Sequence, residues 1–204
     1  MSAHPSLFIA EAAAHPEDGF TKALPYVLVG VVVLIILDLV TSKKSLGGVS
    51  RWNWWETLLY LGTVVSVAIL GFTSFGAMFS RGGLQGWTLF AHMLGAGVLV
   101  AVLPLLALTW CAANRFGRPR GAEQAADDKQ KFHGFAKAMF WIKLTGGLVV
   151  TMTMLLSMLP VFGTEDLRAL LVAHRYAGLV VVLALIFHLY IVLRCKLSAN
   201  RNAT

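Results

Sequence analysis

The stretch ALLVAHRYAGLVVVLALIFHLYIVL, residues 169–193, decides the fold of this chain. It carries one formally charged side chain, Arg175, and is otherwise almost wholly apolar. A helix needs about 20 mostly apolar residues to cross the hydrocarbon core of a bilayer. The stretch is therefore long enough to be a transmembrane helix, and it contains two histidines, His174 and His188.

Four other stretches have the same apolar character, and polar segments separate them. They are Leu24–Val40, Trp54–Met78, Trp87–Ala112 and Ala138–Val161. Across the chain, 57% of the residues are hydrophobic and 13% are charged, whereas soluble domains are about 45–50% apolar and about 25% charged. This composition excludes a soluble enzyme, a disulfide-stapled secreted domain and a disordered tail. We expect an all-α integral membrane protein with five transmembrane helices.

The expected organisation has four parts. Residues 1–23 form an outer segment, residues 24–41 an extra N-terminal transmembrane helix, residues 51–195 a four-helix bundle, and residues 196–204 a cytoplasmic tail. The first helix is expected to stay uncleaved, because residues 1–23 have no basic n-region like that of a signal peptide.

The basic residues divide unequally between the two sides of the expected helices. One side holds Lys43, Lys44, Arg51, Arg115, Arg118, Arg120, Lys129, Lys131, Lys137, Arg194, Lys196 and Arg201. The other side holds Lys22, Arg81 and Arg168. Because cytoplasmic loops carry the excess of Lys and Arg, we expect the first side to be cytoplasmic and the N-terminus to be outside. This rule explains the net charge of +7 without a nucleic-acid partner.

Three histidines fall inside the expected helices, where ionisable side chains are rare and usually functional. His92 and His174 each lie five residues from the outer start of a helix, at a depth of about 8 Å. Two imidazoles at one depth on different helices can ligate an iron from opposite sides. His188 is on the same helix face as His174, about 21 Å further along the axis. The pattern predicts one haem b between His92 and His174 and allows a second near His188.

Each polar or small residue near these histidines has two interpretations. Gly95 and Gly178 leave room for a flat macrocycle, or they let helices approach closely. Arg175 pairs with a haem propionate, or its side chain snorkels to the headgroups. Lys143 is expected to snorkel toward the inner surface. Glu56 is a helix-start carboxylate, or it handles protons near a quinone.

Three motifs carry a resemblance to a known family. The last helix has histidines 14 residues apart, the second within FHLY; the fourth opens with KFHGFAKAMFW, residues 131–141, and the second with RWNWW, residues 51–55. Over about residues 51–194, the chain resembles the cytochrome b (gamma) subunits of respiratory formate dehydrogenase and of nickel–iron hydrogenases. The corresponding family motifs are two haem-ligating histidines 14 apart, KYNxGQKxxFW and RxNHW.

The resemblance implies a four-helix haem-binding bundle in the inner membrane of a bacterium. Carried over residue by residue, it pairs His92 with His174 at an outer haem and assigns His188 to an inner haem. The family's partner of His188 corresponds to Trp54 here, and indole cannot ligate iron. The outer haem is therefore expected to be complete, whereas the inner haem lacks one ligand.

His133 stands where the resembled family has an asparagine near its quinone site. Three interpretations are open: His133 is a substitute axial ligand opposite His188, a quinone-site or proton-delivery residue without a second haem, or an interfacial histidine. On the second interpretation, His133, Lys137 and His188 belong to a quinone-facing end on the cytoplasmic side.

The expected function is electron transfer between a partner on the outer face and the quinone pool. Cys111 and Cys195 have no CxxC spacing, and the sequence shows no nucleotide loop. The catalytic chemistry is therefore expected on other subunits of a respiratory complex, with an iron–sulfur or multihaem protein as the electron partner. A proton- or ion-conducting subunit and a haem-less membrane anchor are the alternatives.

Overall fold

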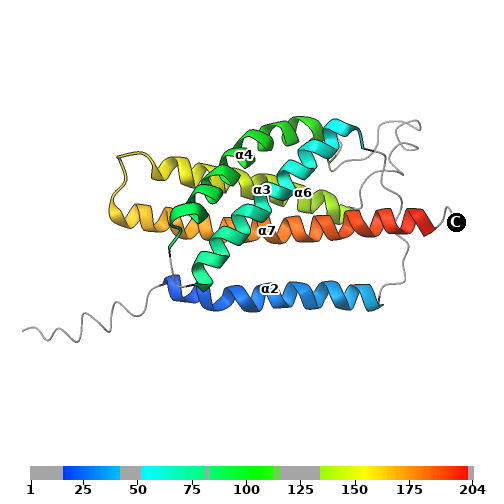
Figure 1. The fold of residues 1–204 in the computed structure, drawn as a ribbon, viewed down its shortest axis with the longest axis horizontal. Helices are drawn as coiled ribbons and strands as arrows, with labels where there is room; N and C mark the ends of the chain where they lie inside the picture. Colours follow the sequence, from blue (N-terminus) through cyan, green and yellow to red (C-terminus); the bar gives the residue numbers. More distant parts are fainter. Residues whose placement is uncertain (1–15, 42–51, 81–82, 113, 115–133, 202–204) are drawn as a thin grey trace, which may run out of the picture. The chain divides into compact units, whose positions relative to one another are not determined.

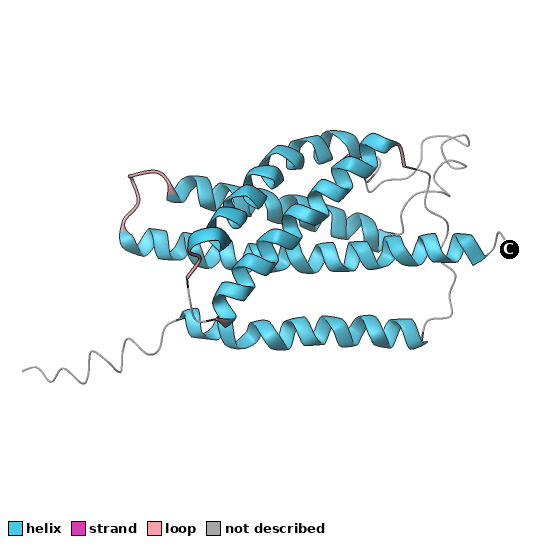
Figure 2. Ribbon diagram, in the orientation of Figure 1, coloured by secondary structure: helices cyan, strands magenta, loops and turns pink. Residues whose placement is uncertain are grey.

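The computed structural model describes residues 16–41, 52–80, 83–112, 114 and 134–201. The regular elements in this part of the chain are all helices, with no strand among them (Figures 1 and 2). They are α2 (Pro16–Thr41), α3 (Trp54–Phe79), α4 (Gly86–Trp110), α6 (Gly134–Ser157) and α7 (Thr164–Arg201). All five are long and apolar enough to span a membrane, as the sequence predicted.

The chain divides into two compact units, residues 1–42 and residues 43–204. The first contains α2, whose 23-residue apolar span runs from Gly19 to Thr41. The second contains the other four helices, and all the candidate ligands of the described residues lie in it.

The four helices of the second unit are arranged as two antiparallel pairs. Helix α3 packs along α4, and α6 packs along α7 (Figure 1). Less extensive contacts join α3 to α7 and α4 to α6. The helices therefore form a ring in the order α3, α4, α6, α7, in which α4 and α7 are diagonally opposite. Side chains from these two helices can meet across the axis of the bundle.

Local hydrogen bonds determine where several helices begin. At the start of α3, the Asn53 side chain accepts a hydrogen bond from the Trp54 N–H at 2.7 Å, and the Asn53 N–H donates to Glu56 Oε2 at 2.8 Å. This reciprocal capping box confirms the interpretation of Glu56 as a helix-start carboxylate. Before α7, the Gly163 N–H donates to Asp166 Oδ2 at 3.2 Å.

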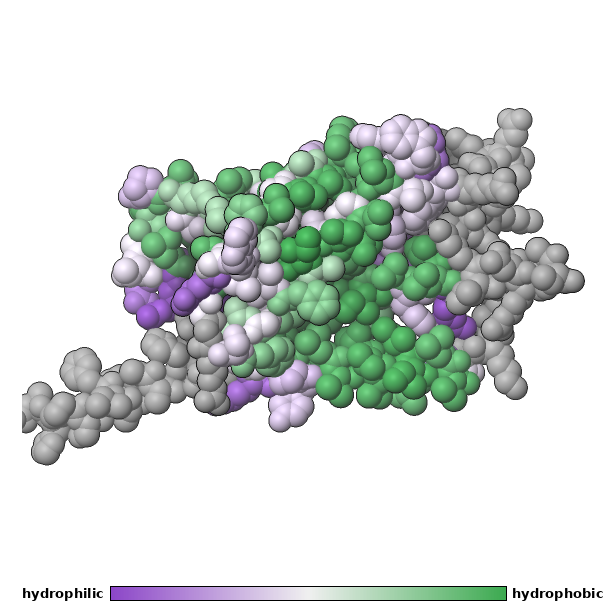
Figure 3. All heavy atoms as spheres, viewed as in Figure 1, coloured by the Kyte–Doolittle hydropathy of each residue, from purple (hydrophilic) through white to green (hydrophobic). Residues whose placement is uncertain are grey.

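The four-helix unit is apolar on its outer surface and partly polar inside. Leu94, Val100 and Leu148 are exposed at 58%, 47% and 55%, while Thr63 and Ser66 are buried. Hydrophobic side chains cover much of the visible helix surface in Figure 3. The buried hydroxyls bond within their own helix: Thr63 donates to the Leu59 carbonyl at 2.8 Å, and Ser66 to the Thr63 carbonyl at 3.0 Å. This distribution is typical of helices whose solvent is lipid.

Adjacent glycines on α6 allow it to approach two neighbouring helices. A Cβ added at Gly146 would lie 2.9 Å from Val181 Cγ2 on α7, and one added at Gly147 would lie 2.9 Å from Leu103 Cδ1 on α4. Val181 belongs to a buried cluster with Val67, Leu99 and Leu185. The members of this cluster come from α3, α4 and α7. The absence of a side chain at Gly146 therefore lets α6 reach this cluster.

Replacing Gly146 with alanine should destabilise the bundle by about 1–3 kcal/mol, because Val181 is β-branched and cannot turn away without moving its backbone. The matched control is Gly97→Ala, because nothing lies within 4 Å of a Cβ built at Gly97. That control should be neutral or stabilising, since alanine favours helix by about 1 kcal/mol over glycine. Unfolding of the detergent-solubilised chain measures both variants. Equal stability of the two would contradict the packing described here.

Candidate functional site

The predicted outer pair of histidines comes from diagonally opposite helices. His92 is in the second turn of α4, and His174 is in the third turn of α7. Both imidazoles are half-buried. The structure thus places the two residues that the sequence assigned to one iron on diagonally opposite helices of the same four-helix unit.

Neighbouring hydroxyls fix the orientation of the His92 ring. Its Nδ1 lies 2.9 Å from Thr73 Oγ1 and 3.3 Å from Ser74 Oγ, both on α3. The Thr73 hydroxyl donates its own proton to the Ile69 carbonyl at 2.7 Å. With that proton on the Ile69 carbonyl, Thr73 Oγ1 can accept from His92, and Nδ1 then carries the ring proton while Nε2 keeps its lone pair.

His174 is held in the same way by helix α6. Its Nδ1 lies 3.2 Å from the Val150 carbonyl and 3.2 Å from Thr153 Oγ1. A carbonyl can only accept, and the Thr153 hydroxyl donates to the carbonyls of Val149 and Val150, each at 2.9 Å. Nδ1 of His174 is therefore also the protonated nitrogen, and Nε2 has the lone pair.

This arrangement is the one that metal-ligating histidines usually adopt. A ligating imidazole commonly donates its second ring N–H to a carbonyl or another acceptor, which fixes the ring and its tautomer. Within the described residues, no group of three or more His, Cys, Asp or Glu side chains could hold a metal ion. Two imidazoles supply only two ligands, so an iron between them needs further ligands from a macrocycle. In such a site, His92 and His174 would each supply one axial nitrogen.

The two predicted cofactor-binding glycines have different surroundings. A Cβ added at Gly95 would lie 3.1 Å from Ile69 Cγ2 and 3.4 Å from Leu70 Cγ, so Gly95 lets α4 pack closely on α3. At Gly178, one turn after His174, a Cβ would meet nothing within 4 Å. Gly178 therefore has open space beside it, and its role in binding a cofactor stays a prediction. Arg175 is half-buried; its pairing with a propionate stays a prediction.

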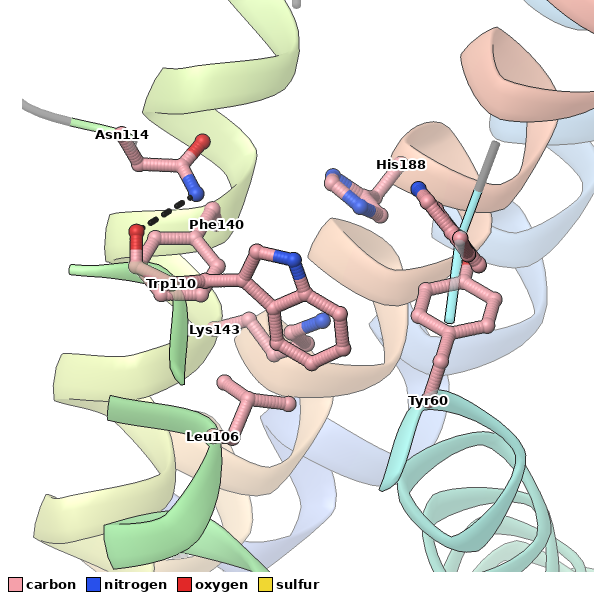
Figure 4. A pocket seen from close by; sticks show the side chains of 8 residues that line it. Tyr60, Leu106, Trp110, Asn114, Phe140, Lys143 and His188 are labelled. Carbon is pink, nitrogen blue, oxygen red and sulfur yellow. Dashed lines mark hydrogen bonds between the residues drawn. The ribbon is translucent and has the colours of Figure 1, made fainter. Parts of the chain in front are cut away.

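Around His188, the inner end of the bundle has a different character. His188 is 4% exposed, and its Nδ1 lies 3.3 Å from the Ala136 carbonyl of α6. The Tyr60 ring is 5.9 Å from the His188 ring, centroid to centroid. His188 also lines a small cavity (Figure 4). The other lining residues are Trp52, Tyr60, Leu106, Trp110, Asn114, Phe140 and Lys143.

The inner cluster leaves little empty space. The cavity has a volume of about 10 Å³, which is enough for roughly one water molecule. Trp110 and Phe140 are buried, and the Lys143 Nζ lies 5.6 Å from the Tyr60 ring centroid and 6.0 Å from that of Phe140. The space beside His188 is thus filled by side chains of the chain itself.

Several sequence expectations at this end can now be placed. Trp54, which replaces the resembled family's ligand, is 70% exposed and lies edge-on to Trp55. Tyr60 of α3 is instead the ring that lies beside His188. Lys137 is half-buried in the first turn of α6, and His133 lies outside the described residues. The expectation that Lys143 snorkels to the inner surface is wrong, because this lysine is 4% exposed within the bundle.

The supporting residues Thr73, Thr153, Tyr60 and Asn114 were not singled out from the sequence. Hydroxyl residues inside apolar spans give one signal. Thr73 is 19 positions from His92, and Thr153 is 21 positions from His174. Such spacings match neighbouring antiparallel helices joined by a short turn. Tyr60 and Asn114 have no comparable signal, because their roles depend on how the helices rotate about their axes.

Comparison of the chain with protein-family models, with curated proteins and with solved structures found no match. The resemblance to cytochrome b subunits therefore stands on the sequence motifs, and the geometry of His92 and His174 carries the functional argument.

Removing the hydroxyl that holds His92 should weaken a haem bound there. Thr73→Val preserves the shape of the side chain but leaves Nδ1 without its closest acceptor, and such changes typically cost about 10–100-fold in metal affinity. Thr73→Ser keeps the acceptor and should bind haem nearly as the wild type does. Haem titration of the purified apoprotein, followed by visible absorption, measures the affinities. A Thr73→Val protein with wild-type affinity would show that this hydrogen bond has no part in ligation.

Proposed function

We propose that this chain is a haem b membrane subunit of a respiratory oxidoreductase complex. The observation that carries the proposal is the pair of imidazoles on diagonal helices, each with Nδ1 engaged as a donor and Nε2 left as the ligating nitrogen. A bound haem would supply one-electron chemistry. The chain's own residues hold and orient it: His92 and His174 are the axial ligands, and Thr73, Thr153 and the Val150 carbonyl fix the two rings.

One haem per chain is the expected content. At the inner end, the buried Lys143 and several aromatic side chains lie around His188, which supports one haem rather than two. His188 accordingly acts as a core residue that links α7 to the Ala136 carbonyl of α6. The same argument excludes a quinone ring from the cavity. We place the quinone instead on the cytoplasmic side of the bundle, near Lys137 and His133.

Absorption spectroscopy tests the haem proposal directly. Purified wild-type protein should show sharp b-type bands on reduction and one iron per chain. His92→Ala and His174→Ala should each abolish those bands, because an axial ligand is lost. His15→Ala, which removes an imidazole outside the four-helix unit, is the matched control and should keep the full spectrum. A His92→Ala protein with an unchanged low-spin spectrum would overturn the assignment.

A proton-conducting membrane subunit is the second candidate, and the buried Lys143 is the observation that favours it. Ionisable side chains inside the membrane often belong to proton pathways. The spectrum separates the two functions, because a proton-conducting subunit without haem has no visible bands. Proton flux through vesicles that contain the haem-free protein would then support this alternative.

The chain is proposed to have its N-terminus outside and its C-terminus in the cytoplasm of a bacterial cell. The excess of basic residues on one side supports this orientation. After Cys111 and Cys195 are replaced by alanine, a single cysteine in segment 115–133 should resist an impermeant maleimide in intact cells. A single cysteine in segment 81–86 should be labelled. The opposite labelling pattern would reverse the proposed topology.

The electron partner is proposed to be an iron–sulfur or multihaem protein on the outer face, where the His92–His174 site lies close to the membrane surface. The substrate chemistry of the complex would be carried out by such subunits. This chain would then pass electrons between that partner and the quinone pool.

A further inference from the structure

The buried amine of Lys143 has unusual surroundings for a charged group. It lies between the Tyr60 and Phe140 rings, and the residue is 4% exposed. Within the part of the chain that the structure describes, Lys143 makes no hydrogen bond or ion pair with a protein group. An ammonium group in an apolar interior is costly unless polar groups replace its hydration. The protein side chains around Lys143 leave that requirement unmet.

Two other polar atoms beside the same cavity lack partners. The Tyr60 hydroxyl and the Asn114 Oδ1 atom are both buried, and neither has a hydrogen bond. Asn114 is 2% exposed, and its amide nitrogen already donates to the Trp110 carbonyl at 3.0 Å. Leaving such a buried group unsatisfied costs about 1–3 kcal/mol. These two buried atoms without a partner and the Lys143 amine, whose contacts are with the faces of aromatic rings, line one space.

The size of the cavity limits what that partner can be. A volume of about 10 Å³ is the space that one water molecule needs, and a buried water typically has two to four polar partners. Lys143, Tyr60 and Asn114 come from three different segments and all line this space (Figure 4). A nucleotide, a quinone or a lipid headgroup would be far too large.

The balance of donors and acceptors favours water over a small anion. Lys143 is a pure donor, the Tyr60 hydroxyl can donate or accept, and Asn114 Oδ1 is a pure acceptor. An anion cannot donate to Asn114 Oδ1, and the aromatic faces that line the cavity carry negative partial charge. A water molecule accepts from Lys143 and donates to Asn114 Oδ1 at the same time.

We propose that the cavity is a binding site for one structural water, which accepts a hydrogen bond from Lys143 Nζ and bonds to the Tyr60 hydroxyl and Asn114 Oδ1. The water replaces part of the hydration of the Lys143 amine. It also connects α3, α6 and the segment after α4 at the inner end of the bundle. This inference does not depend on whether a haem is bound at His92 and His174.

A double-mutant cycle on the full chain in detergent tests the proposal. The Tyr60 hydroxyl and Lys143 have no direct hydrogen bond, and Tyr60→Phe keeps the ring over which Lys143 Nζ lies, 5.6 Å from the centroid. The cycle therefore reports on the hydroxyl and not on the ring contact. Tyr60→Phe should lower the thermal midpoint by about 2–4 °C when Lys143 is present. In the Lys143→Met background, where the water has lost its main donor, Tyr60→Phe should leave the midpoint unchanged or raise it. Equal shifts in both backgrounds would overturn the proposal. The control Tyr26→Phe, at an exposed tyrosine of α2, should have no effect in either background.

A second measurement keeps the proposal testable if a variant fails to fold. An experimental structure of the wild-type chain that resolves ordered waters should show one water within hydrogen-bond distance of Lys143 Nζ, Tyr60 Oη and Asn114 Oδ1. An empty cavity would overturn the proposal. Crystals grown with bromide in place of chloride supply the remaining test: an anomalous bromide peak in the cavity would identify an anion instead of water.

Discussion

Satisfaction of polar groups inside an apolar solvent is the constraint on which the rest of this structure depends. No water in the core of a bilayer can hydrogen-bond to an exposed donor or acceptor, so each polar side chain must find a partner within the protein. Many leucine and valine side chains are therefore exposed on the outer surface, whereas the polar side chains of Thr63, Ser66, Lys143, Thr153 and His188 are buried within the bundle. The interior of the bundle is consequently the place where chemistry can occur.

Polar side chains at the two ends of the bundle differ in how their hydrogen-bonding groups are satisfied. At the outer end, Nδ1 of each imidazole contacts a group on a neighbouring helix. For His92 this group is the Thr73 hydroxyl, and for His174 it is the Val150 carbonyl together with the Thr153 hydroxyl. With both Nδ1 atoms engaged in these hydrogen bonds, the two Nε2 atoms are the nitrogens that the proposal assigns to the iron. At the inner end, aromatic rings surround Lys143, and the polar atoms nearby lack partners among the protein groups.

The number of helices and their approximate spans could be predicted from the sequence, because the thickness of the bilayer fixes the length of an apolar run. The ends were less predictable. Helix α6 begins at Gly134 and ends at Ser157, four residues earlier at each end than the apolar stretch Ala138–Val161. Helix α7 begins at Thr164, where a hydrogen bond between Gly163 and Asp166 determines its start. Such capping contacts depend on single polar residues and do not follow the boundary of an apolar run.

The pairing of His92 with His174 could be proposed from depth alone, since both lie equally far from the outer ends of their helices. The partners of those histidines could not, because the contacts of Thr73 and Thr153 depend on the rotation of α3 and α6 about their axes. Lys143 shows the same limit. Its position along α6 suggested a side chain that reaches the inner surface, but the rotation of the helix directs it between the rings of Tyr60 and Phe140.

The central claim is that His92 and His174 bind the same iron from opposite sides. Electron paramagnetic resonance of the oxidised, haem-loaded full chain tests this most directly, because two axial imidazoles give a low-spin ferric signal. The account predicts a single low-spin species that integrates to one haem per chain. A high-spin, five-coordinate ferric signal would contradict it, since that signal would mean that only one of the two histidines ligates the iron.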